Sequence, residues 1–185
     1  MPPSAAIRVR VANYASQASP DFLGRAEREA SRILAEAGLQ IIWVNCPRVD
    51  SSSSLRDPCL GPLEATDVVL RVLPRVNRAK FQDTEFGFAV VPTLASVYSE
   101  RVMRLAVSDE ATFEGPISLG CVIAHELGHL LLGSGSHART GIMQSRWDRK
   151  QIRQATTGRL LFTEEESQRM KREVAARAGL HEPHR

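Results

Sequence analysis

Apolar residues in the first hundred positions occur in short runs separated by polar loops, which is the pattern of β-strands. Ile7–Asn13 alternates apolar and polar side chains, which predicts a half-buried strand, whereas Leu39–Asn45 is mostly apolar, which predicts a buried strand. Prolines at positions 74 and 92 end two later runs. The pattern predicts five strands, at Ile7–Asn13, Leu39–Asn45, Asp67–Leu73, Phe86–Val91 and Leu94–Tyr98.

Helical periodicity appears in four segments. The first is bounded by the helix-start residues Ser19, Pro20 and Asp21 and by Gly38, a residue typical of a helix end. Because this helix lies between two strands, we expect a parallel crossover with the helix packed behind the sheet. The predicted helices are Phe22–Ala37, Ile117–Leu132, Gln144–Thr157 and Thr163–Ala178.

The second predicted helix, Ile117–Leu132, contains the sequence His-Glu-x-x-His. His125 and His129 are one turn apart on one face, so both imidazoles can bind one metal ion. Glu126 is about 100° around the helix from His125 at ~3.6 residues per turn, beside the metal rather than on it. This is the position of a general base that takes a proton from an attacking water.

A third histidine, His137, follows in a glycine-containing loop that ends at Met143. Three histidine ligands would leave the fourth zinc position open, as catalysis requires. A glutamate from the group Glu164–Glu166 is an alternative third ligand, although Thr163 and Glu166 also form the pattern of a capping box. Cys121, one turn before His125, could face the metal or be a small buried core residue.

These residues resemble the active site of the metzincin clan of zinc metallopeptidases, whose motif is HExxHxxGxxH followed by a methionine turn. His125, Glu126, His129 and Met143 match that motif. At the family's glycine and third-ligand positions this chain has Leu132 and Gly135, so Gly133 and His137 take those roles if the loop has two extra residues.

The resemblance implies an α/β (α+β) catalytic domain with a five-stranded mixed twisted sheet, a backing helix, an active-site helix and a C-terminal helix. It implies that the fourth strand is an antiparallel edge above the cleft, where a peptide substrate could add as a further strand. The expected substrate-binding residues are therefore Phe86, Gly87, Phe88, Ala89 and Val90. Met143 would form a hydrophobic floor under the histidines.

The expected function is hydrolysis of a peptide or protein substrate by a single zinc ion (Zn2+), with Glu126 as the base, in a zinc metalloendopeptidase. Two alternatives stay open: a catalytically silent zinc-binding module for peptides or proteins, and a zinc hydrolase of a non-peptide substrate. Hydrolysis of a mixed peptide library would distinguish the enzyme from the catalytically silent module.

Composition adds limits to this interpretation. The length of 185 residues predicts one domain, at 1–178, with a flexible tail at 179–185, and a monomer. No uninterrupted apolar run reaches membrane-spanning length, and aromatic residues make up only 5%, which disfavours a nucleic-acid partner. The net charge is +3, but basic residues exceed acidic ones after Met143. That excess indicates either a solvated helix face or a basic wall that favours acidic peptides.

Cys46 and Cys59 flank a polar loop and could form a disulfide or remain free thiols. A disulfide would indicate an oxidising compartment, whereas the N-terminal residues show no apolar segment typical of a secretory signal. The compartment is therefore left open by the sequence.

Overall fold

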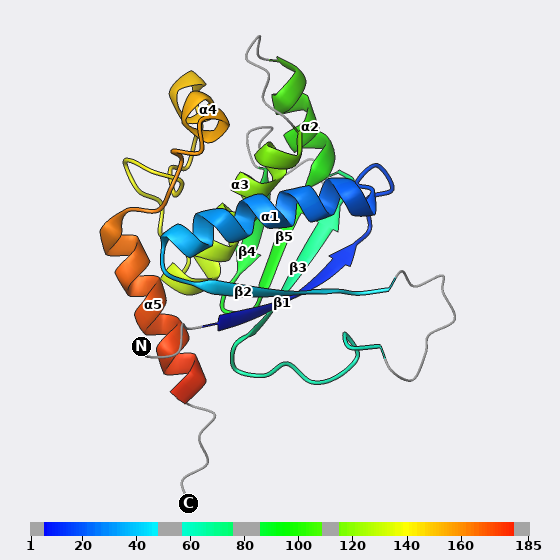
Figure 1. Ribbon diagram of the computed structural model, residues 1–185, viewed down its shortest axis with the longest axis vertical. Coiled ribbons are helices and arrows are strands. Elements are labelled where there is room, and N and C mark those ends of the chain that lie inside the picture. The colour runs from blue at the N-terminus through cyan, green and yellow to red at the C-terminus, as the bar shows by residue number, and fades with distance from the viewer. Residues whose placement is uncertain (1–5, 48–56, 76–85, 109–114, 180–185) are drawn as a thin grey trace, which may run out of the picture.

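The structure, a computed structural model, describes residues 6–47, 57–75, 86–108 and 115–179. Five strands form one mixed sheet in the order β2-β1-β3-β5-β4 (Figure 1). The first four strands of that order pair in parallel, and β4 pairs antiparallel with β5 at the edge. The fold class predicted from the sequence is confirmed. The strands are β1 (Ala6–Asn13), β2 (Gln40–Asn45), β3 (Asp67–Leu73), β4 (Gly87–Val90) and β5 (Leu94–Tyr98).

Helices α1 and α3 pack against each other and against the same face of the sheet (Figure 1). Helix α1 begins where Ser19 Oγ accepts a hydrogen bond from Phe22 N, and Gly38 follows its end with a φ of 79°. That positive φ suits glycine, which has no Cβ to clash. The helices are α1 (Pro20–Glu36), α2 (Ser99–Ser108), α3 (Gly115–Leu132), α4 (Arg149–Thr156) and α5 (Glu164–Gly179).

The core lies between the sheet and these helices. Because side chains alternate along a strand, every second residue of the central strands points toward α1 and α3. These side chains are almost fully buried, and they are Val9, Val11, Val68, Leu70, Val72, Ala95 and Val97. Helix α3 therefore packs on an apolar layer, which places its histidines beside β4.

Helix α3 is long and apolar enough, by length and composition, to cross a membrane, with a mean hydropathy of 1.3 over 18 residues. The sequence analysis did not predict a segment of membrane-spanning length. The structure explains it, since 89% of this stretch is buried inside the fold. The apolar character of α3 thus matches that of a central core helix.

On the opposite face of the sheet, a disulfide and an ion pair hold a loop in place. Cys46 and Cys59 are bonded, and closing a loop of this length contributes roughly 3 kcal/mol to stability. Arg10 and Asp67 are both buried and contact each other at 2.6 Å, Nη2 to Oδ2. Arg10 also donates to the carbonyl oxygens of Gly61 and Pro62, so it anchors the loop as well as pairing its charge.

Three elements differ from the sequence prediction. Strand β2 was expected to be buried, but it is an edge strand with half-exposed residues, because only β1 pairs with it. Helix α2 was not predicted, since it follows β5 with no turn residue between them. Helix α4 begins at Arg149 rather than near Gln144, because Asp148 caps it and accepts from Lys150 N at 2.7 Å.

Some predicted features lie outside the described residues. They are residues 180–185 of the tail that the sequence predicts at 179–185. Helix α5 itself continues through Gly179, with Met170 and Val174 fully buried.

Candidate metal centre

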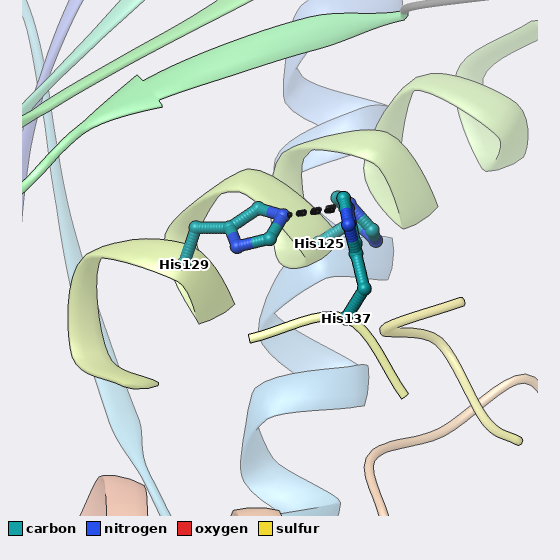
Figure 2. A group of neighbouring side chains, drawn as sticks. All are labelled: His125, His129 and His137. Carbon is teal, nitrogen blue, oxygen red and sulfur yellow. Dashed lines mark hydrogen bonds between the residues drawn. The ribbon is translucent and has the colours of Figure 1, made fainter. Parts of the chain in front are cut away.

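Two histidines of α3 point their Nε2 atoms into the same space. The Nε2 atoms of His125 and His129 are 3.1 Å apart, and the two rings meet edge to face (Figure 2). The spacing of four residues places the two side chains one helical turn apart. His129 is buried and His125 is partly buried, so the apolar core and not solvent surrounds most of each ring.

The loop after α3 brings His137 to the same place. Gly133 and Gly135 have φ angles of 96° and 76°, which reverse the chain directly after the helix. His137 Nε2 then lies 3.2 Å from His129 Nε2, and Figure 2 shows the three rings converging from the helix and the loop. One ligand atom from each histidine lies within 4.8 Å of the others. The extra residues between His129 and His137 are thus accommodated by the glycine turns.

Hydrogen bonds on the outer side of the rings orient two of the histidines. His125 Nδ1 lies 2.8 Å from the carbonyl oxygen of Ile142, and His129 Nδ1 lies 3.0 Å from Ser136 Oγ. A carbonyl oxygen only accepts, so Nδ1 of His125 must be protonated. In the neutral ring, this leaves the Nε2 of His125 with a free lone pair, which is the form that binds a metal.

Burial keeps these rings neutral. The pKa of His125 is lowered to about 3, mainly by burial; the bond to Ile142 O raises it in part, and the neighbouring His129 and His137 also act to lower it. The pKa of His129 falls to about 4, first through burial and then through His137. Both imidazoles are therefore in the metal-binding form at neutral pH.

The histidine geometry fits zinc. In a tetrahedral site with bonds of ~2.0–2.1 Å, two ligand nitrogens are about 3.3 Å apart. The observed separations of 3.1 and 3.2 Å match that value. Three nitrogen ligands would leave the fourth zinc position open, and all three histidines line a cleft.

We expect the metal-free protein to lose stability as the pH falls from 6.5 toward 5. The unfolded histidines take up protons near pH 6.5, whereas His125 and His129 in the folded protein remain neutral until about pH 3 to 4. Protonation therefore favours the unfolded chain in this window, by at most about 1.4 kcal/mol per pH unit for each histidine.

Denaturant unfolding with a chelator present, repeated at several pH values, measures this slope. The double variant His125→Asn/His129→Asn is the control, and its slope should be shallower. A parent protein whose stability is constant or rises as the pH falls from 6.5 to 5 would contradict the expectation.

Met143 packs against the helix that holds the histidines. It is fully buried, and a Cβ on Gly128 would lie only 2.7 Å from Met143 Sδ and 2.8 Å from Phe162 Cε1. Glycine at 128 therefore allows this close contact. The turn is closed by Ala138 N, which donates to Met143 O at 2.9 Å. Met143 therefore packs closely on α3 at Gly128, the residue before His129.

Glu126 is buried, 5% exposed, and lines the same cleft as the histidines. Gly87 of β4 lies directly over its carboxylate, since a Cβ at Gly87 would be 2.8 Å from Glu126 Oε1. The same Cβ would be 2.5 Å from the backbone oxygen of Ser96. Glycine therefore fits at this position of β4, whereas any residue with a Cβ would overlap with the Glu126 carboxylate and with Ser96 O.

The cleft has a volume of about 420 Å³ and lies between β4 and the segment after Met143. Phe86 and Trp147 face each other with ring centroids 6.3 Å apart, and Trp147 lies 5.9 Å from the ring of His125. The expected residues Phe86, Gly87, Phe88 and Ala89 line the cleft, whereas Val90 does not. Four of the five residues expected on the edge strand thus reach the site.

The other candidate ligands are placed elsewhere. Glu166 Oε2 accepts from Thr163 N at 2.7 Å, and Thr163 Oγ1 accepts from Glu166 N, so this glutamate caps α5. In the described part of the chain, the metal-binding group contains the three histidines and no residue of 164–166. Cys121 is buried, and burial raises the pKa of its thiol. On α1, the charge of Glu29 raises this pKa as well, whereas Arg32 lowers it.

No family model and no curated protein sequence matches this chain. Solved structures do match. An archaemetzincin from Methanopyrus kandleri superposes with a TM-score of 0.58 and 17% identity, over 94% of this chain and 98% of that one. A zinc-dependent peptidase from Methanocorpusculum labreanum gives a TM-score of 0.57 and 16% identity, over 89% and 99% of the two chains. The shared property is the fold.

Three residues of the site were not found from the sequence, and the role of a fourth, Gly87, was only partly predicted. Ile142 and Ser136 orient the histidines, and Trp147 forms a wall of the cleft. Gly87 was expected only to bind substrate, although it also makes room for Glu126. A backbone carbonyl and a lone serine produce no pattern in a sequence, whereas Trp147 could have been noticed as one of only two tryptophans.

Proposed function

We propose that this protein is a zinc-dependent peptidase of the metzincin type that cleaves within peptide chains. The observation that supports this most is the convergence of three histidine Nε2 atoms beside the buried Glu126 in an open cleft. His125, His129 and His137 would hold a single zinc ion, and Met143 would form the floor of the site. The two archaeal structures with this fold include one described as a zinc-dependent peptidase, which is consistent with the proposal.

When bound, zinc supplies Lewis-acid activation of a water molecule and of the substrate carbonyl. Glu126 acts as the general base: its carboxylate takes the proton of the attacking water and passes it to the leaving amine. The walls of the cleft and β4 over the carboxylate limit its contact with solvent. The histidines stay neutral through burial and remain available as ligands at neutral pH.

Strand β4 provides the substrate-binding edge in this proposal. Tyr98 N donates to Phe86 O at 2.8 Å, so this antiparallel pair is hydrogen-bonded. Because such pairs alternate, Gly87 and Ala89 direct their N–H and C=O groups away from β5. Within the described residues no strand pairs with that side of β4. An extended peptide could therefore bind to Gly87 and Ala89, next to Glu126.

Peptide hydrolysis with and without metal tests the function. Protein loaded with zinc, shown by elemental analysis to hold about one zinc per chain, should cleave members of a mixed peptide library. A chelator should abolish this cleavage, and added zinc should restore it. Zinc binding without cleavage of any peptide would contradict the peptidase and favour a binding module or a hydrolase of another substrate.

Replacing Gly87 with alanine should reduce kcat by roughly 10- to 100-fold, since small displacements of a catalytic group have effects of this size. The added Cβ would overlap with the Glu126 carboxylate and with Ser96 O. Zinc content should be unchanged. Kinetics of hydrolysis and elemental analysis measure the two quantities, and thermal unfolding reports any loss of folding.

A double variant shows whether Gly87 acts through Glu126. In the Glu126→Gln background, Gly87→Ala should have little further effect on the remaining activity, because both changes affect the same group. If Gly87→Ala slows both backgrounds by the same factor, the glycine acts on substrate binding or folding instead.

A further inference from the structure

The wall of the cleft opposite β4 consists of the segment that follows Met143. Trp147 is held there because its indole N–H donates to Ile142 O at 3.2 Å, the same carbonyl that accepts from His125 Nδ1. The residue before it, Arg146, lines the cleft and is exposed. Arg146 thus directly precedes a fixed aromatic residue and lines the same cleft as the three histidines.

Arg146 dominates the charge of this wall. Apart from the three histidines and Glu126, it is the one ionisable side chain among the described residues that line the cleft. It forms no ion pair with any described residue. Strand β4, on the other side, contributes only glycine and apolar side chains.

The acidic residue nearest in sequence does not neutralise this wall. Asp148 accepts from Lys150 N at 2.7 Å and forms a capping box with Gln151, which places its single negative charge at the start of α4. The helix then adds exposed basic residues, Arg149, Lys150 and Arg153. Residues 146–153 thus contain four basic side chains and one acidic side chain, and the segment keeps a net positive charge beside the cleft.

We infer that Arg146 determines specificity and selects acidic peptides, with an acidic side chain close to the scissile bond and an apolar side chain against Phe86 and Trp147. This inference rests on the proposed peptidase function. An acidic side chain entering the cleft would find Arg146 as its partner, and a basic one would be repelled. A partly exposed ion pair of this kind changes affinity modestly, by up to about fivefold.

Matched quenched peptides test the inference. One parent peptide with a central apolar residue is made with Glu or Lys at each position on both sides of the scissile bond. For at least one position, the parent enzyme should have a kcat/KM about fivefold higher for Glu than for Lys. Arg146→Gln should bring this ratio close to one, and Arg146→Glu should invert it.

Arg149→Glu is the matched control, because it makes the same charge change three residues away at an exposed position that does not line the cleft. Its Glu-to-Lys ratio should stay at the parental value. A ratio that survives Arg146→Glu, or that changes equally in Arg149→Glu, would overturn the inference.

Binding measurements keep the inference separate from catalysis. The zinc-loaded Glu126→Gln protein should bind the Glu peptides more tightly than the Lys peptides, and Arg146→Glu should reverse the order. If the parent cleaves no peptide but this binding preference holds, the peptidase proposal fails while the acidic preference of the cleft stands. If binding shows no preference dependent on Arg146, the inference is wrong whether or not the parent is active.

Discussion

Glu126→Gln should leave zinc binding intact and reduce peptide hydrolysis by about 100-fold or more. Glutamine has nearly the same size as glutamate, so it fits the space under Gly87. It cannot accept a proton from water at neutral pH, and general-base catalysis is lost while the histidines are unchanged. Steady-state kinetics on one quenched peptide and elemental analysis of the same protein measure both effects.

The control for this change is Glu164→Gln, which alters the same kind of residue at an exposed position in the first turn of α5. It should have parental activity and zinc content. A Glu126→Gln protein that cleaves as fast as the parent would show that Glu126 is not the base. One that loses its zinc would show that the carboxylate is needed for metal binding.

His137→Ala should weaken zinc binding by at least about 100-fold, since even the loss of an outer hydrogen-bond partner of a metal ligand costs 10- to 100-fold. His137 Nε2 lies 3.2 Å from His129 Nε2, the separation expected of two ligands of one zinc ion. Alanine removes that nitrogen and leaves only the two histidines of α3. Competition with a chromophoric chelator measures the zinc dissociation constant.

The glutamates of α5 are the matched controls, because they are the competing candidates for the third ligand. Glu164→Ala, Glu165→Ala and Glu166→Ala should bind zinc like the parent. Glu166→Ala should also lower stability by about 1 kcal/mol, because the capping box with Thr163 is lost. If a glutamate variant releases the metal and His137→Ala does not, the ligand set resembles that of thermolysin-like enzymes.

Predictions from the sequence succeeded where a local pattern had one structural solution. The alternation in Ile7–Asn13 and the capped helix after Ser19 both appear in the structure with nearly the expected bounds. The crossover between β1 and β2 is parallel because the helix that joins them covers the core face. The antiparallel edge strand β4, expected from the resemblance, is confirmed.

Predictions failed where the outcome depended on neighbours that are distant in sequence. The residues of β2 are as apolar as those of a buried strand, yet β2 lies at the edge since no other strand pairs beyond it. Helix α2 follows β5 directly, so no breaker residue separates a strand from a helix. The start of α4 is decided by the cap of Asp148, which the weak apolar pattern of the segment did not indicate.

The sequence by itself determined the chemistry available on α3. Residues three or four positions apart on a helix lie on neighbouring parts of its surface. The arrangement of His125, Glu126 and His129 therefore needs no tertiary information. The tertiary structure decided the contacts between segments that are separated in sequence: where His137 lies, which carbonyl orients His125, and how close Gly87 comes to Glu126. The physical reason is that helix geometry is set by local backbone bonds, whereas contacts between a loop, a sheet edge and a helix depend on packing of the whole core.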